Sequence, residues 1–247
     1  MHTSPLPVDD SLAKTADRLI LAALAASGLV ALALGQQFGQ LGTALWAGGL
    51  LLALGAAAGT LAAGSLLAWW LPVYWLDRLD WQPALAISQP WRWWTAAFVH
   101  WSAGHLAANL GAAVVVGAFG LAGRVPRACA LAWLAAWPLT HGLLWLQPAL
   151  LHYGGLSGVL HAGVAVVLVF LLARGERRQR VIAAMVTAGL LVKLWLEAPW
   201  GEPLRHSAGW DIALAPIGHA TGALAGALCA LVMLAAGARA VAPVAAP

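Results

Sequence analysis

Long apolar runs separated by short polar breaks fill most of this 247-residue chain. Hydrophobic residues make up 62% of the sequence, and charged residues only 9%. A soluble domain of this length cannot bury so many apolar side chains, whereas a helix that crosses a bilayer needs about 20 consecutive apolar residues. The sequence therefore predicts an all-α, polytopic membrane protein.

The polar breaks divide the apolar runs into seven predicted spans. Two lie in the N-terminal third, at 18–35 and roughly 46–71, where the division is less clear, so totals of six and eight spans stay open. A tryptophan-rich connection over residues 77–100 is expected to lie in the lipid headgroup zone. The other spans are expected near residues 103–121, 127–146, 157–173, 181–198 and 213–236.

Basic residues predict the orientation, because Lys and Arg accumulate on the cytoplasmic side of a membrane. Arg124 and Arg127 share one predicted loop, the basic stretch 174–180 follows two spans later, and Arg239 follows the last span. All of these positions fall on one side if the spans alternate. That side is predicted to be cytoplasmic, so the spans that begin near residues 157 and 213 begin on the outer side.

A serine set among glycines opens the span at 157–173, in the run Gly154-Gly155-Leu156-Ser157-Gly158. The first N–H groups of a helix have no partner within the helix and can stabilise a developing oxyanion, while glycine permits close backbone approach. Ser157 is therefore a candidate nucleophile. The simpler interpretation is a patch of small residues for helix packing, which is common in membranes.

A histidine opens the last span, in the run Pro216-Ile217-Gly218-His219-Ala220-Thr221-Gly222. A base within hydrogen-bond reach of a serine can activate this weak nucleophile. No acidic residue is obviously placed to orient His219, since Asp211, the nearest upstream carboxylate, lies in a loop. We therefore expect a Ser157–His219 dyad in which packing holds the imidazole. The simpler interpretation is a lone histidine bonded to a backbone carbonyl.

Small residues predict how these two spans approach each other. Gly218, Gly222 and Gly226 recur every four residues and so share one helical face, and Gly158 lies on a similar face of the serine span. Small residues let helix backbones approach closely in a membrane. Packing of the two faces would bring Ser157 within reach of the histidine.

The third element is a polar pair, His105 and Asn109, which shares one face near the outer end of the span at 103–121. Both side chains can donate to an oxyanion, and loss of one such donor costs about 2.7–4 kcal/mol of transition-state stabilisation. The alternative is a pair of ordinary interhelical hydrogen bonds. The preceding residues, His100 to Ser102, are expected to line a path for water.

These motifs together resemble the rhomboid intramembrane serine proteases. Over roughly residues 75–235, the elements Trp91-Arg92, His105-x-x-x-Asn109, Gly155-Leu156-Ser157-Gly158 and His219-x-x-Gly222 occur in the family's order. The resemblance implies a rhomboid-like six-helix core, Ser157 as nucleophile, His219 as general base, and an oxyanion site formed by His105, Asn109 and the Ser157 N–H. It implies no cofactor and no metal.

This resemblance divides the chain into four parts. They are an N-terminal tail (1–17), an extra N-terminal apolar segment (18–45), a rhomboid-like intramembrane protease domain (46–237) and a disordered tail (238–247). The extra segment would add a transmembrane helix to the six-helix core.

Finer features resemble the rhombosortase branch, which is implicated in removing C-terminal Gly-Gly sorting tails (GlyGly-CTERM) from exported bacterial proteins. One is His161, where many rhomboids carry tyrosine, and another is the run Lys193-Leu194-Trp195-Leu196-Glu197. Gly218 departs from the alanine usual in the family. The resemblance implies transmembrane substrates with a glycine-rich C-terminal tail, in the lipids of the bacterial inner membrane, and an active site that opens to the periplasm.

Lys193 and Glu197 lie four residues apart inside a predicted span, where an ion pair lowers the cost of both charges. The alternative is that they bind substrate together with Trp195. Gly155 and His161 are also expected to line the site.

Other classes of function predict different sequence motifs. A general rhomboid protease with other transmembrane substrates stays open, as does a pseudoprotease that binds helices without cutting them, although such a binder needs no full set of catalytic groups. A metal peptidase or a transporter is disfavoured, since there is no His-Glu-x-x-His and no paired repeat. No basic stripe interleaved with aromatics indicates nucleic-acid binding.

Overall fold

The computed structural model describes residues 44–71, 73–207 and 209–241. The predicted tail 1–17, the apolar segment 18–35 and the final residues 242–247 lie outside this part of the chain. The described residues from Gly48 onward form one compact unit. Within the described residues, the chain is helical except for loops and two isolated β-bridges.

Five of the described helices are long and apolar enough to cross a membrane. A further helix, α2 (Ala44–Trp69), has 26 residues and matches the long span predicted at 46–71. The prediction of an all-α polytopic membrane protein is confirmed, while the total of seven spans stays a prediction. The five helices are α5 (Ala103–Ala122), α6 (Arg127–Gly142, continued by the 3-10 turn η2, Leu143–Leu146), α7 (Ser157–Arg174), α8 (Arg177–Glu197) and α9 (Pro216–Val241).

Two helix boundaries differ from the sequence prediction for local reasons. Helix α8 begins at Arg177, because Glu176 and Gln179 form a reciprocal capping box at its N-terminus. Helix α9 begins only at Pro216, because Leu214 is still paired with Arg205 in a β-bridge. Helix α9 also continues to Val241, beyond residue 238, where the C-terminal tail is predicted to begin.

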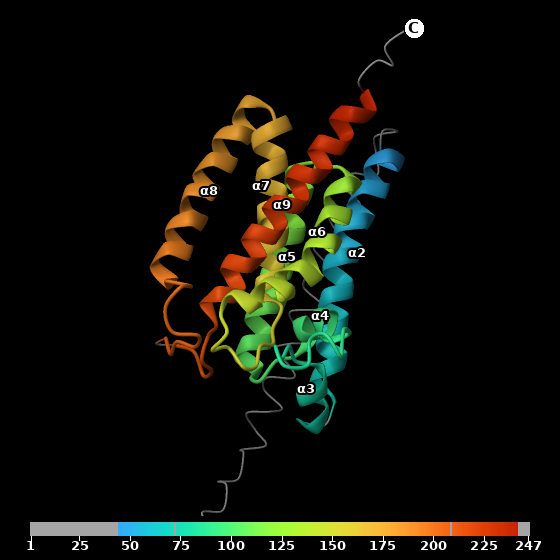
Figure 1. The fold of residues 1–247 in the computed structure, drawn as a ribbon. Coiled ribbons are helices and arrows are strands. Elements are labelled where there is room, and N and C mark those ends of the chain that lie inside the picture. Colours follow the sequence, from blue (N-terminus) through green and yellow to red (C-terminus); the bar gives the residue numbers. More distant parts are fainter. Residues whose placement is uncertain (1–43, 72, 208, 242–247) are drawn as a thin grey trace, which may run out of the picture. The chain divides into compact units, whose positions relative to one another are not determined.

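Helices α7 and α8 have opposite environments. Helix α7 contacts α5, α6, α8 and α9, and 56% of its span is buried inside the protein. Helix α8 lies at the side of the bundle, with only 6% of its span buried (Figure 1). The short turn between them carries the basic residues 174–180, at the end of α7 opposite Ser157.

Glycines bring α7 and α9 into backbone contact. A methyl group at Gly222 would overlap the backbone of Gly158, and one at Gly226 would overlap the backbone of Ala162. The small faces expected on these two spans therefore meet in the structure. This contact places the first turns of α7 and α9 beside each other.

The tryptophan-rich connection is folded into the protein. It contains α3 (Val73–Leu79), α4 (Arg92–Thr95) and the turn η1 (Ala96–Phe98). Arg92 pairs with Asp80 at 2.9 Å, and both side chains are almost fully buried. Trp81 is fully buried and pairs with the backbone of Tyr153, just before the serine, so this segment also packs against the protein. Its place in the headgroup zone stays a prediction.

Candidate active site

Ser157 is the first residue of α7 and follows a sharp backbone turn. Gly155 has φ +122°, a conformation that side-chain-bearing residues rarely adopt, and its N–H donates to Ala96 O at 2.9 Å. The first hydrogen bond of the helix runs from Leu160 N–H to Leu156 O. The N–H groups of Ser157, Gly158 and Val159 precede it, so they lie at the helix N-terminus where an anion is stabilised.

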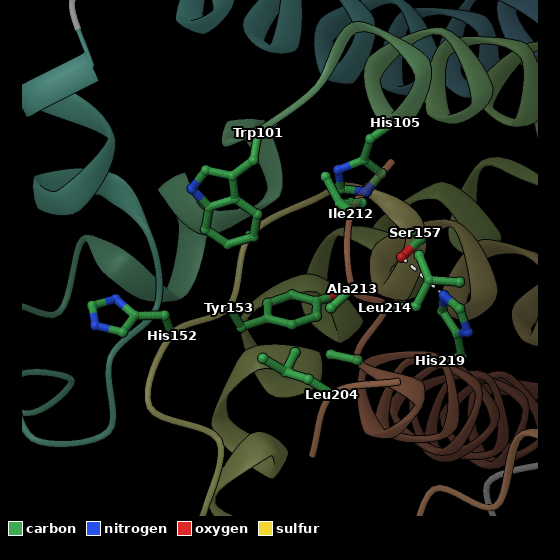
Figure 2. Close-up of a pocket in the computed structure, with 12 residues that line it drawn as sticks. Trp101, His105, His152, Tyr153, Ser157, Leu204, Ile212, Ala213, Leu214 and His219 are labelled. Carbon is green, nitrogen blue, oxygen red and sulfur yellow. Dashed lines mark hydrogen bonds between the residues drawn. The ribbon is translucent and has the colours of Figure 1, made fainter. Parts of the chain in front are cut away.

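His219 lies in the first turn of α9 and faces this serine. Its Nε2 is 3.1 Å from Ser157 Oγ, as the dashed line in Figure 2 shows. Gly222, one turn later, sits against the backbone of Gly158. The contact between the two helices therefore holds nucleophile and base at hydrogen-bond distance.

The α5 pair lies on the other side of the turn before the serine. A methyl group at Gly155 would lie 2.8 Å from His105 Nε2 and 3.7 Å from Asn109 Nδ2, so both side chains line this turn. Ser102 caps α5 by accepting from the His105 N–H at 3.0 Å. The structure thus brings His105 and Asn109 next to the loop that carries Ser157.

His100 was expected to line a water path, but it is a buried partner of Asn109. Its Nδ1 is 3.0 Å from Phe98 O and must donate, because a carbonyl only accepts. Its Nε2 therefore accepts from Asn109 Nδ2, also at 3.0 Å. Burial, reinforced by His105, lowers the pKa of His100 to about 4, which keeps the ring neutral and able to accept.

A loop before α9 closes the site. Leu204, Ile212 and Leu214 line the pocket that contains Ser157 and His219 (Figure 2), and Ser102 Oγ donates to Asp211 Oδ1 at 2.7 Å. The pocket has a volume of about 30 Å³. That is room for about one water molecule and too little for a peptide.

An acidic residue does contact the histidine, so the expectation that packing alone holds the imidazole is wrong. Glu197, the last residue of α8, places Oε2 2.9 Å from His219 Nδ1. It also forms the expected ion pair with Lys193, at 3.0 Å. Trp195 is not part of this group, because it is 70% exposed and its ring packs on Trp200.

His161 lies behind the general-base candidate. Its ring stacks on His219 with centroids 4.3 Å apart and planes 18° apart. Its two nitrogens are 2.7 Å from Ser157 O and 2.7 Å from Lys193 Nζ. Apart from Trp195 and the packing residue Gly226, the predicted site residues thus lie in or directly beside one constellation.

A family model described as the Rhomboid domain matches residues 88–236. The chain belongs to the rhomboid family. No curated protein matches it closely. Rhomboids are generally intramembrane serine proteases, although some are inactive. The matched region includes the α5 pair, the serine and the histidine.

One residue of this rhomboid site was missed in the sequence. Tyr153 lines the pocket beside Ser157, and its hydroxyl lies close to Gly158 and Gly218. Burial raises the pKa of its phenol, which therefore stays protonated at neutral pH. A single tyrosine ahead of the glycine run carries no pattern that would have identified it.

Proposed function

We propose that this rhomboid is an active serine endopeptidase that cleaves transmembrane proteins within the membrane. The observation that carries the proposal is the 3.1 Å contact between Ser157 Oγ and His219 Nε2 at the N-termini of two packed helices. A protein that only bound helices would have no use for this contact, nor for a set of hydrogen-bond donors beside it.

In the first step, Ser157 Oγ attacks the scissile carbonyl carbon and His219 Nε2 takes the hydroxyl proton. The tetrahedral oxyanion is stabilised by the Ser157 N–H and by donors from His105 and Asn109. Because one Asn109 N–H is already given to His100, the other is the one available for the oxyanion. The C–N bond then breaks, and the imidazolium returns the proton to the departing amine.

In the second step, water hydrolyses the acyl-enzyme. His219 takes a proton from the water, whose oxygen attacks the ester carbon, and the C–Oγ bond breaks as the proton returns to Ser157. The product carboxyl group and the free serine are then released. The roughly 30 Å³ pocket fits such a water, whereas the entry of a peptide needs movement of the loop that carries Ile212 and Leu214.

We further propose the rhombosortase activity, which is removal of a Gly-rich C-terminal sorting tail from exported bacterial proteins. His161 and the Lys193–Glu197 pair, the features that suggested this branch, gather around His219. Glycines near the end of a substrate helix unwind readily and expose a carbonyl to attack. The basic residues that follow α5 and α7 favour an inner-membrane orientation with the serine on the periplasmic side. Residues 46–237 are the proposed protease domain.

Fluorophosphonate labelling of the purified protein tests the serine protease. Labelling of the parent but not of Ser157→Ala or His219→Ala is the expected result. Equal labelling of the parent and Ser157→Ala would refute the assignment of the nucleophile. If the folded parent fails to react even with a small isocoumarin, the helix-binding pseudoprotease gains support instead.

Co-expression with reporters tests the substrate. One reporter ends in a Gly-Gly motif, a transmembrane helix and a basic tail, and its matched control has the two glycines replaced by leucine. Cleavage of the first alone, lost with Ser157→Ala, is expected. Equal cleavage of both reporters would favour the general rhomboid protease with other transmembrane substrates.

A further inference from the structure

Four polar side chains form a connected group behind Ser157, and the proton positions in that group decide whether His219 can act as a base. The members are His161 on α7, Lys193 and Glu197 on α8, and His219 on α9. Every neighbouring pair among them lies within hydrogen-bond distance or in ring contact.

His161 has only one tautomer that satisfies both of its neighbours. Its Nδ1 faces Ser157 O at 2.7 Å, and a carbonyl oxygen can only accept, so Nδ1 carries the hydrogen. Nε2 is then a lone pair, and it accepts from Lys193 Nζ at 2.7 Å. One of the three Lys193 hydrogens is thereby fixed on His161.

A second Lys193 hydrogen goes to Glu197. The two groups lie 3.0 Å apart, and an ionised carboxylate accepts only. The third hydrogen is the one that could reach His219, since Lys193 Nζ is also 3.0 Å from His219 Nδ1. Lys193 and Glu197 thus both approach His219 Nδ1. Lys193 can only donate a hydrogen to this nitrogen, whereas Glu197 can only accept one from it.

The two approaches select opposite tautomers of His219. If Nδ1 accepts from Lys193, the hydrogen must sit on Nε2, which then faces Ser157 with a proton and cannot act as a base. If Nδ1 donates to Glu197 at 2.9 Å, the Nε2 lone pair faces Ser157 Oγ. Only the second tautomer lets His219 take the serine proton.

We propose that Glu197 is a positioning residue that holds His219 in the base-competent tautomer and so completes a Ser157–His219–Glu197 triad. Lys193 is the balancing cation, and two of its three hydrogens are taken by His161 and Glu197. This inference rests on the proposed protease activity. The carboxylate also stabilises the imidazolium that forms when the serine proton moves to Nε2, while the proton itself stays on His219 until the amine leaves.

The end of α8 is built to hold this carboxylate in place. Ala198 has φ +47°, which stops the helix immediately after Glu197. Arg205 Nη1 then donates to the Glu197 backbone carbonyl at 2.7 Å. These contacts hold the backbone of Glu197, so its side chain reaches His219 from a defined position.

The test measures the rate constant of fluorophosphonate labelling for four proteins: the parent, Glu197→Gln, Lys193→Met and the double variant. In Glu197→Gln, the neighbouring ammonium attracts the amide oxygen and turns the amide NH₂ toward His219 Nδ1, which selects the inactive tautomer. The comparable change in a serine protease triad costs about 10⁴-fold. We expect a loss of about 10²–10⁴-fold here, with kcat lowered and KM unchanged on a cleaved reporter.

The matched control distinguishes a triad from a helix-stabilising ion pair. Lys193→Met leaves Glu197 on His219, so its loss of labelling should be at least about tenfold smaller than that of Glu197→Gln, and the double variant should fall between the two single variants. An ion pair that only stabilised α8 would make the two single variants equally slow and the double variant close to the parent. That pattern, or a Glu197→Gln rate equal to that of the parent, would overturn the proposal.

The melting temperature of each variant shows whether a slow rate comes from misfolding, and labelling of the parent tests the protease assignment separately. Each variant must melt near the parent temperature; if Glu197→Gln does not, Glu197→Asp repeats the test, since it keeps the charge but withdraws it by one methylene. A slower rate in folded Glu197→Asp supports the triad, and an unchanged rate refutes it. Absence of labelling in the parent itself would refute the protease and the triad together, whereas normal parental labelling with unaffected Glu197 variants refutes the triad alone.

Discussion

The two sides of His219 are built from different contacts. Toward α7, glycines bring backbone against backbone in the buried interior. Toward α8, a mostly exposed helix reaches the same ring through the charged ends of Lys193 and Glu197. The first contact sets how far Nε2 lies from the serine, and the second sets where the protons on the ring are. Distance and proton position are thus controlled by separate parts of the protein.

The largest expected effect comes from breaking the apolar side. In Gly222→Ala, the new methyl group overlaps the Gly158 backbone, which no rotamer change can relieve. Overpacking of this kind costs about 1–3 kcal/mol, and α7 and α9 must separate at the catalytic turn. We expect loss of fluorophosphonate labelling together with a lower melting temperature.

Gly189→Ala is the matched control, because a methyl group on α8 at Gly189 meets nothing within 4 Å. It should label like the parent and gain up to about 1 kcal/mol of stability from the helix propensity of alanine. Parental labelling by Gly222→Ala would mean that backbone contact does not set the distance between Ser157 and His219.

The two sides also differ in what the sequence could predict. The four-residue spacing of Gly218, Gly222 and Gly226 is visible in the chain, because helical periodicity is local. The placement of Glu197 is not, because it depends on how α8 is oriented relative to α9. The Lys193–Glu197 spacing predicted only the ion pair within α8, and the contact with His219 appears once the helices are placed.

The same division holds on α5. The spacing of His105 and Asn109 predicted a shared face, whereas the bond from Asn109 to His100 depends on a bend between η1 and α5. The apolar runs fixed the number and approximate limits of the described spans, since each must match the bilayer. Loop segments such as 77–100 could not be predicted, because their burial comes from contacts with residues far along the chain.

The next largest effect tests the donors on the α5 side. Asn109→Ala removes the proposed oxyanion donor without touching Ser157 or His219. Loss of one such donor lowers kcat by about 10²–10³-fold, so we expect slower reporter cleavage with KM nearly unchanged. A raised KM with normal kcat would instead place Asn109 in substrate binding.

The pH dependence of the melting temperature tests the buried polar contact made by His100 on the α5 side. The pKa of buried His100 is lowered from 6.5 to about 4, so the unfolded state binds the proton more strongly than the folded state. The stability from this residue is therefore fully present above pH 6.5 and declines as the pH falls toward 4. His100→Phe should melt with a shallower pH dependence than the parent over this interval, whereas Gly189→Ala should keep the parental slope. Equal slopes in the parent and His100→Phe would show that His100 is not buried in its neutral form.

The smallest expected effect concerns the loop that closes the pocket, where one exposed polar contact joins α5 to the segment before α9. Asp211 accepts from Ser102 at 2.7 Å, and a hydrogen bond to a charged group contributes about 1.5–3 kcal/mol when buried but less at an exposed site. Asp211→Asn weakens this contact and leaves Ser102 as the cap of α5. If closure of the loop limits entry, labelling by a bulky fluorophosphonate should accelerate about two- to fivefold, while a small isocoumarin should react at nearly the parental rate. A change in access depends on how much room each probe needs, whereas a change in the activation of Ser157 acts on probes of any size. Equal acceleration of both probes would therefore mean that Asp211 affects the reactivity of Ser157 and not access to it.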